Sequence, residues 1–221
     1  MIDIFSLKVE EIASKIKNAQ LTSVEVCEKY IERINKFEKH VKAWVHFDKK
    51  LLLEKAAEAD EHRRSGKPTG PLHGIPVAVK DIVGTVDMPT ECGTVIRKGK
   101  SYSQNAEIID LLLAAGAIVM GKTATAELAY LGPPKTTNPH DHSRTPGGSS
   151  SGSAAAVASF IIVEAVLNFF SISFLRGILK FPKFSLFTGY QFPYWSTLPV
   201  IAMPIFLDLD IFKFLIFFSI C

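Results

Sequence analysis

Along the amino-terminal part of the chain, apolar residues recur with the period of an α-helix. The spacings of three, four and three place four such residues on one helix face: Val24, Cys27, Ile31 and Ile34. Residues 22–25, Thr-Ser-Val-Glu, have the pattern of a capping box, which favours a helix start. We predict two helices in this opening segment and another over residues 51–63, which are rich in Ala, Glu and Leu.

Short apolar runs bounded by turn residues follow, and they predict buried strands. One lies within residues 70–81 and a second occupies residues 117–120. Between them, residues 105–115 have the composition of an apolar-rich helix, and Gly116 is placed to end it. Residues 41–47 also have strand-like composition. Strand, helix, strand with short connections is typical of an α/β fold.

The charge and the cysteines argue against some classes of function. The net charge is +3 and no run of lysine and arginine forms a basic stripe, so we expect no nucleic-acid contact. Three widely spaced cysteines are typical of a reducing compartment rather than of a disulfide framework or a metal knuckle. Residues 1–17 lack the apolar stretch of a secretory signal, and we therefore expect a cytoplasmic protein.

The composition changes sharply close to residue 160. Of the 16 phenylalanines, 13 lie in residues 160–221, whereas only seven charged residues do. A step of this size marks a change of domain, of environment or of origin. We therefore treat residues 1–159 and residues 160–221 as separate parts of the chain.

Lys80 stands at the end of the first predicted apolar strand, directly after Val77, Ala78 and Val79. Burial disfavours the ammonium form and lowers the pKa, so that a buried lysine can act as a base. The more ordinary alternative is a lysine whose stem lies on the core while its head reaches water. The strand alone leaves both interpretations open.

Residues 147–153, Gly-Gly-Ser-Ser-Ser-Gly-Ser, lead into an alanine-rich helix predicted over residues 153–158. A flexible linker is one interpretation. A phosphate-binding loop at a helix start is another, although no lysine follows the second glycine as that motif requires. The third is a catalytic loop, in which hydroxyls relay a proton to a neutral lysine and glycines permit close backbone approach.

Taken together, the two segments resemble the amidase-signature family. Residues 74–81, Gly-Ile-Pro-Val-Ala-Val-Lys-Asp, are similar to its lysine motif, and residues 146–158 are similar to its glycine- and serine-rich motif. Their order and spacing agree with the family, and residues 116–123 and 137–139 between them also match. The resemblance covers essentially all of residues 1–159.

The resemblance implies an α/β fold, with a mixed β-sheet core flanked by helices, of which this chain holds an incomplete part. It also implies hydrolysis or transfer of the acyl group of a small-molecule amide by a Ser-Ser-Lys triad, with no cofactor and no metal. By motif position, Lys80 is the base and Ser149 is the bridging serine, held by a cis peptide bond. The second serine attacks the carbonyl while backbone amides hold the oxyanion.

The nucleophilic serine that the resemblance implies is absent. The family carries it in a glycine–serine turn before Ile-Arg-Pro, whereas residues 168–175 read Asn-Phe-Phe-Ser-Ile-Ser-Phe-Leu. Ser173 lies at about the right distance, but no glycine flanks it, and we interpret its position as chance. We therefore expect the chain to be inactive as written.

Two explanations of residues 160–221 remain open. We favour a frameshift or a truncation. The alternative is a membrane-seeking tail, because residues 184–207 carry no formal charge and are long enough to cross a bilayer, although three prolines interrupt them. The oligomeric state is also open.

Three functions follow from these alternatives. The first, which we favour, is an amidase that is inactive as written. The second is the A-type component of an amidotransferase that amidates mischarged tRNA, because residues 1–159 do not separate it from a small-amide hydrolase. The third is a non-enzymatic, membrane-associated fragment. The six histidines need no catalytic role, and we expect His73, His140 and His142 to form hydrogen bonds in loops. His140 and His142 are two residues apart without a third ligand, which is weak evidence for a zinc site.

Overall fold

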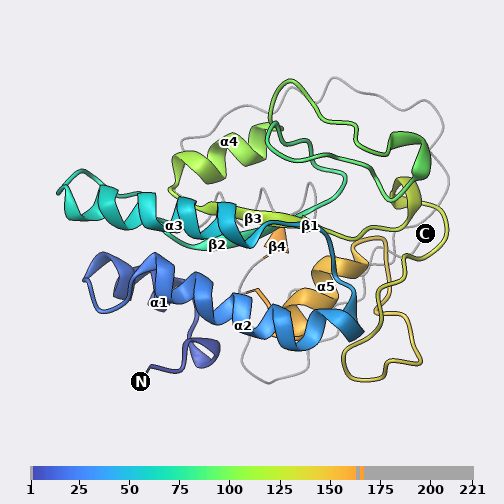
Figure 1. Ribbon diagram of the computed structural model, residues 1–221, viewed down its shortest axis with the longest axis horizontal. Coiled ribbons are helices and arrows are strands. Elements are labelled where there is room, and N and C mark those ends of the chain that lie inside the picture. The colour runs from blue at the N-terminus through green and yellow to red at the C-terminus, as the bar shows by residue number, and fades with distance from the viewer. Residues whose placement is uncertain (1, 163–164, 167–221) are drawn as a thin grey trace, which may run out of the picture.

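The computed structural model describes residues 2–162 and 165–166 of the chain. They form a four-stranded mixed sheet with helices around it (Figure 1). The strands lie in the order β1-β3-β2-β4, where β3 is antiparallel to β1 and parallel to β2, and β4 is parallel to β2. Their bounds are Trp44–Phe47 for β1, Pro76–Lys80 for β2, Ile118–Thr123 for β3 and Ala165–Val166 for β4. The predicted mixed α/β core is therefore confirmed.

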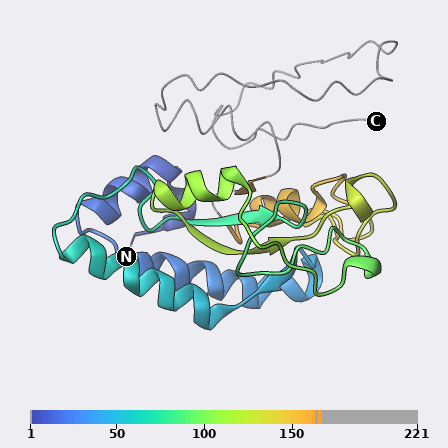
Figure 2. The ribbon, with the colours of Figure 1, turned by 90° about the horizontal axis from the view of Figure 1, so that it is seen from above.

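Two long helices, α2 (Ser23–Val41) and α3 (Lys49–Arg64), lie side by side (Figure 2). The predicted capping box begins α2. The Thr22 hydroxyl accepts a hydrogen bond from the Glu25 N–H at 3.1 Å, and the Glu25 carboxylate accepts one from the Thr22 N–H at 2.8 Å. A cap of this kind stabilises a helix by about 1 kcal/mol.

A buried carboxylate joins the two helices. Asp60 of α3 is 3% exposed, and its oxygens accept hydrogen bonds from the N–H groups of Ser23 at 2.8 Å and Val24 at 3.1 Å. These amides belong to the first turn of α2, where backbone donors have no partner inside the helix. Asp60 therefore fixes where α2 starts relative to α3.

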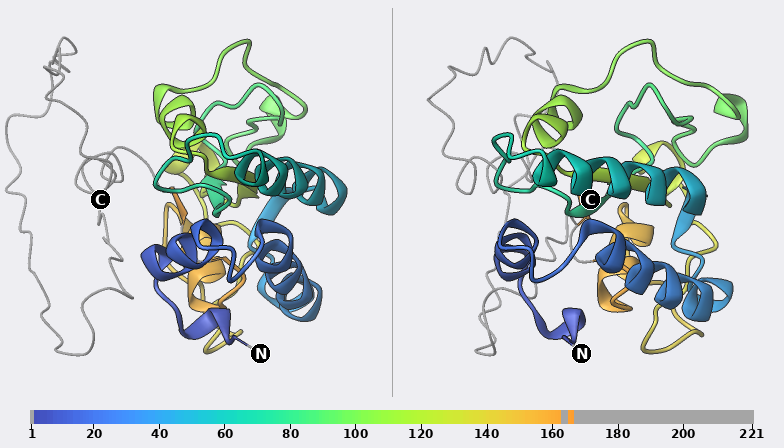
Figure 3. Two further views of the ribbon diagram at one scale, coloured as in Figure 1. Left: turned by 90° about the vertical axis from the view of Figure 1, so that its left-hand side faces the viewer. Right: turned by 60° about the vertical axis from the view of Figure 1, so that its left-hand side comes forward.

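The central strands β2 and β3 are connected through α4 (Glu107–Ala114), which lies on the side of the sheet opposite to α5 (Ser151–Ala158; Figures 1 and 3). Gly116 ends the α4 segment with a φ of +86°, and a Cβ at this position would lie 2.9 Å from the His73 Cα. The predicted glycine stop is confirmed. The remaining elements are η1 (Ile4–Ser6), α1 (Val9–Lys17), η2 (Val95–Arg97) and η3 (Glu127–Ala129).

All residues of β2 and β3 are buried, including two lysines. Buried side chains such as Val77, Val79 and Ile118 each contribute roughly 1.5–3 kcal/mol through the hydrophobic effect. The predicted strand over residues 117–120 continues to Thr123 in the structure. The core therefore extends past the apolar run and takes in polar side chains at the ends of both central strands.

Packing onto this core continues a short way past residue 159. Ile161 is fully buried and Ile162 is 2% exposed, and β4 pairs with β2. Ser173 and the apolar segment 184–207 lie outside the described residues. Within the described residues, none of the helices has the length and apolar character that a bilayer crossing requires.

Candidate active site at the end of strand β2

Lys80 is the last residue of β2, which lies between β3 and β4 in the sheet. Its side chain is 1% exposed. Because β2 has a neighbour on each edge and α5 packs against it, the Nζ atom lies in the interior. The alternative in which the lysine head reaches water is therefore wrong.

Ser149 lies in the loop that precedes α5, and its hydroxyl oxygen accepts a hydrogen bond from the Lys80 Nζ at 2.7 Å. The two residues stand 69 positions apart in the chain. The peptide bond between Gly148 and Ser149 is cis, the conformation that the family resemblance implies for the bridging serine. The structure therefore brings the two predicted site residues into direct contact.

The loop that carries Ser149 is held by several hydrogen bonds. The Ser149 carbonyl oxygen accepts one from the Ala126 N–H at 2.9 Å and one from the Thr125 hydroxyl at 3.0 Å. The Ser151 hydroxyl donates to the Gly147 carbonyl at 2.6 Å. Since these bonds fix both sides of Ser149 to the segment after β3 and to α5, the loop is not a flexible linker.

A second pair of hydroxyls lies next to this site. Thr123 is the register partner of Lys80 on β3, and its hydroxyl lies 2.6 Å from that of Ser153 in α5. Both residues are buried. The sequence analysis did not single out these two residues. The signal for Thr123 is the parallel pairing of β2 with β3, which places it beside Lys80. The pair seats α5 on the sheet and so helps to set the position of the preceding loop.

Burial lowers the pKa of Lys80 from 10.5 to about 8, because the interior disfavours the ammonium form. With a pKa of about 8, roughly one molecule in ten carries a neutral Lys80 amine at pH 7. A neutral amine can accept a proton from a hydroxyl 2.7 Å away, whereas an ammonium can only donate to it. The pair can therefore pass a proton in either direction.

The histidines lie apart from this pair. The Nε2 atom of His73 is 2.9 Å from the Ala59 carbonyl, and the Nδ1 atom of His142 is 3.3 Å from the Thr137 hydroxyl. His140 donates its backbone N–H to the Asn138 side chain at 2.9 Å. Among the described residues, no group of three or more His, Cys, Asp or Glu side chains could hold a metal ion.

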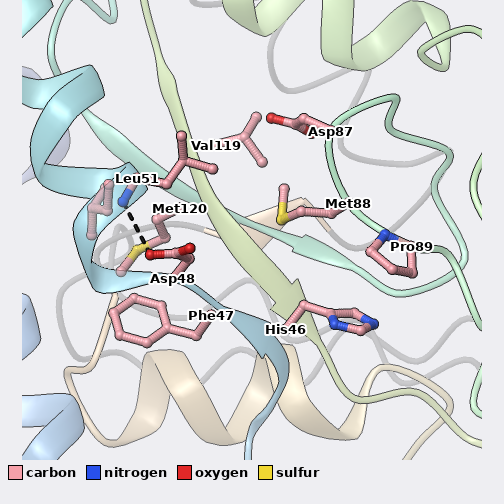
Figure 4. Close-up of a pocket in the computed structure, with 10 residues that line it drawn as sticks. His46, Phe47, Asp48, Leu51, Asp87, Met88, Pro89, Val119 and Met120 are labelled. Atoms are coloured by element: carbon pink, nitrogen blue, oxygen red, sulfur yellow. Dashed lines mark hydrogen bonds between the residues drawn. The ribbon is translucent and has the colours of Figure 1, made fainter. Parts of the chain in front are cut away.

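A cavity of about 230 Å³ lies beside β1 and β3 and does not include Lys80 or Ser149 among its lining residues (Figure 4). Its wall combines the start of α3 with residues 87–89 and with Val119 and Met120 of β3. The charged groups at its rim already have partners, since Asp48 caps α3 and Asp87 pairs with Lys55 at 2.6 Å. The cavity is therefore a feature separate from the lysine–serine pair.

Comparison with known proteins places these features in a family. A family model described as Amidase matches residues 25–166, a range that contains Lys80 and Ser149. The chain belongs to the amidase-signature family. The region that the family model matches ends at residue 166, before Ser173.

Named relatives of this amidase-signature chain fall into two groups. It is 40% identical over 165 residues to the A-type component of the glutamyl-tRNA(Gln) amidotransferase of Chloroflexus aggregans, covering 72% of this chain and 34% of that one. The native peptide amidase of Stenotrophomonas maltophilia superposes with a TM-score of 0.66 at 30% identity, covering 72% and 35%. An amidase family protein of Bacillus anthracis gives 0.66 at 30% identity, covering 74% and 35%. The chain thus spans about a third of the length of the relatives it matches.

Proposed function

We propose that Lys80 and Ser149 are the base and the bridging serine of a Ser-Ser-Lys triad that cleaves the C–N bond of carboxylic amides. The observation that carries this proposal is the hydrogen bond of 2.7 Å between the Lys80 Nζ and the Ser149 Oγ in the interior of the fold. The lowered pKa of Lys80 supports it, because a base must be neutral to accept a proton. The amidase names of the structural relatives support the choice of bond.

In this proposal the neutral Lys80 amine takes the proton of the Ser149 hydroxyl, and Ser149 takes the proton of the nucleophilic serine. That serine forms a bond to the amide carbonyl carbon, and the amine leaves with a proton returned along the same route. Water then hydrolyses the acyl-enzyme. The 221 residues contain no glycine–serine turn before Ile-Arg-Pro, so we propose that this chain by itself does not form the acyl-enzyme.

Two experiments test the proposal. The first treats the purified chain with a fluorophosphonate probe, which labels activated serines; we expect no labelled serine. The second replaces the matching segment of the Stenotrophomonas maltophilia peptide amidase with residues 25–166 and measures hydrolysis of peptide amides.

The chimera separates a catalytic role from a structural one when it carries Lys80→Met or Ser149→Ala. We expect hydrolysis by the chimera and a loss of about a thousandfold or more in each variant, with unchanged circular dichroism. Full hydrolysis by both variants would exclude these residues as base and bridging serine. A control, Ser150→Ala, alters the same loop and should retain the activity.

A specific observation also favours an amidotransferase component. The relatives that carry the glutamyl-tRNA(Gln) amidotransferase name reach 40% identity, whereas the peptide amidase reaches 30%. If this second function is correct, the chain should co-purify with the other components of such an enzyme when they are expressed together. A chain that elutes without them would favour the small-amide hydrolase.

A further inference from the structure

A second lysine lies buried beside Lys80. Lys122 belongs to β3, is fully buried, and is the register partner of Val79. Its neighbour Thr123 is the partner of Lys80 and contacts α5. Because successive side chains on a strand point to opposite faces, Lys122 projects from the face of the sheet opposite to that of Lys80 and Ser149.

The surroundings of the two amines differ. The Lys122 Nζ donates to the Val83 carbonyl at 2.6 Å and to the Thr90 hydroxyl at 2.7 Å, and it lies 3.9 Å from Oδ1 of Asp81. Two of these contacts are hydrogen bonds, and the contact with the Asp81 carboxylate is a longer ion pair. Burial lowers the pKa of both lysines to about 8, but Asp81 counters this effect at Lys122, whereas Lys80 has, within the described part of the chain, only the Ser149 hydroxyl as a hydrogen-bond partner.

Two of the groups around Lys122, the Asp81 carboxylate and the Val83 carbonyl, belong to the turn that directly follows Lys80. The Lys80 carbonyl accepts hydrogen bonds from the N–H groups of Ile82 at 2.8 Å and Val83 at 3.0 Å. Asp81 donates its N–H to the Thr123 carbonyl at 2.9 Å. Lys122 thus contacts two residues of this turn, Asp81 and Val83, from the face of the sheet opposite to that of Lys80.

The carboxylate of Asp81 completes this arrangement. Asp81 is 1% exposed, and its Oδ1 accepts a hydrogen bond from the Glu91 N–H at 3.1 Å. The Asp81 carbonyl accepts one from the Cys92 N–H at 2.9 Å. A buried carboxylate and a buried ammonium neutralise each other, whereas either alone would be an uncompensated charge inside the protein.

We propose that Lys122, paired with Asp81, is a positioning residue that fixes the end of β2 and thereby holds the Lys80 amine buried against Ser149. This inference rests on the proposed function of Lys80. Lys122 does not act as a second base, because it faces away from Ser149 and its Nζ is hydrogen-bonded to Val83 and Thr90. It touches neither Ser149 nor the loop that carries it.

Loss of Lys122 should act on the pKa of Lys80 in two ways, both in the same direction. A loosened turn admits water to the Lys80 amine, and an Asp81 carboxylate without its cation favours a charged lysine nearby; both raise the pKa of Lys80. The other titratable groups around the pair are Asp87 and Cys92 beside Lys122, and His46 beside Asp81. His46 lowers the pKa of Asp81 in the same direction as Lys122, but by less.

The test is the titration of Lys80 in the full chain, followed by NMR of carbon-13-labelled lysine and assigned by the loss of its signal in Lys80→Met. In Lys122→Met we expect the pKa of Lys80 to rise by about one unit or more, a tenfold smaller fraction of neutral amine at a given pH. Thr90→Val, which removes one acceptor of Lys122, should give a smaller rise in the same direction.

A matched control separates positioning from general loss of stability. Leu52→Ala truncates a buried side chain of α3 and should lower the melting temperature without moving the pKa of Lys80. An unchanged pKa in Lys122→Met overturns the inference. If Lys122→Met does not fold, an unchanged pKa in Thr90→Val has the same meaning. An ordinary Lys80 pKa in the unmodified chain would instead contradict the proposed function.

Discussion

Gly152 lies directly against the backbone of Ala124. Its N–H donates to the Ala124 carbonyl at 2.9 Å, and a Cβ at Gly152 would come within 2.3 Å of the Ala124 nitrogen. The Ala43 carbonyl would lie at the same distance on another side. The first turn of α5 therefore rests on the chain between β3 and η3 with no space for a side chain.

This contact predicts that Gly152→Ala is destabilising. The added methyl group must displace backbone atoms, and overpacking of this kind costs about 1–3 kcal/mol. Urea denaturation followed by circular dichroism measures the change. Gly132→Ala is the matched control, since no atom lies within 4 Å of its Cβ position and we expect a change below about 0.5 kcal/mol. Equal stability of the two variants would contradict the close contact.

Lys80 should make the stability of the chain depend on pH. Its pKa is about 8 when folded and about 10.5 when unfolded, so the unfolded state binds more protons between these values and stability rises with pH there. Below pH 8 the buried ammonium is destabilising by about 2–4 kcal/mol. We therefore expect Lys80→Met to be more stable than the unmodified chain at pH 7, with a difference that shrinks towards pH 10. Thermal denaturation across this range checks it, and a constant difference would count against the lowered pKa.

The hydroxyls of Thr123 and Ser153 should depend on each other. Thr123→Val leaves the Ser153 hydroxyl buried without the partner that now lies at 2.6 Å, which costs about 1–3 kcal/mol. Adding Ser153→Ala removes the unpaired group, so the double variant should lose less than the sum of the single variants. Urea denaturation of the four proteins gives the coupling energy. Strict additivity would show that the two hydroxyls do not interact.

Arg33 is expected to stabilise the end of α5. Its guanidinium donates to the Ser159 carbonyl at 2.9 and 3.2 Å and lies 5.6 Å from the ring centre of Phe160. Arg33→Met keeps the apolar stem and removes these contacts, at an expected cost of about 1–2 kcal/mol. Hydrogen exchange should show faster exchange at Ser159 and Phe160, while amides in β3 remain protected. Unchanged exchange at both residues would contradict this role.

The sequence predicted the elements well where apolar residues recur at regular spacings. The capping box at Thr22 and the glycine stop at Gly116 were recognisable because their signals are local. The contact of Lys80 with Ser149 followed from the family resemblance, since the 69 residues between them show no pattern that brings them together.

The sequence did not predict the last part of β3. The polar residues after Met120 interrupt the apolar run, so the pattern ended the strand there. In the structure the strand continues because Lys122 and Thr123 find buried partners, Thr90 and Ser153 among them. Such partners come from distant segments, and hydrophobic periodicity carries no information about them. The cytoplasmic location remains a prediction.

The strand order has a consequence for the synthesis of this chain. β1 and β2 leave the ribosome before β3, yet in the sheet β3 separates them. Neither of the two earlier strands can pair with its neighbour in the sheet until residues 118–123 have emerged. Lys80 is therefore synthesised well before the segments that bury it, β3 and α5. A nascent chain that pauses after α3 or β2 would expose unpaired strand edges to chaperones.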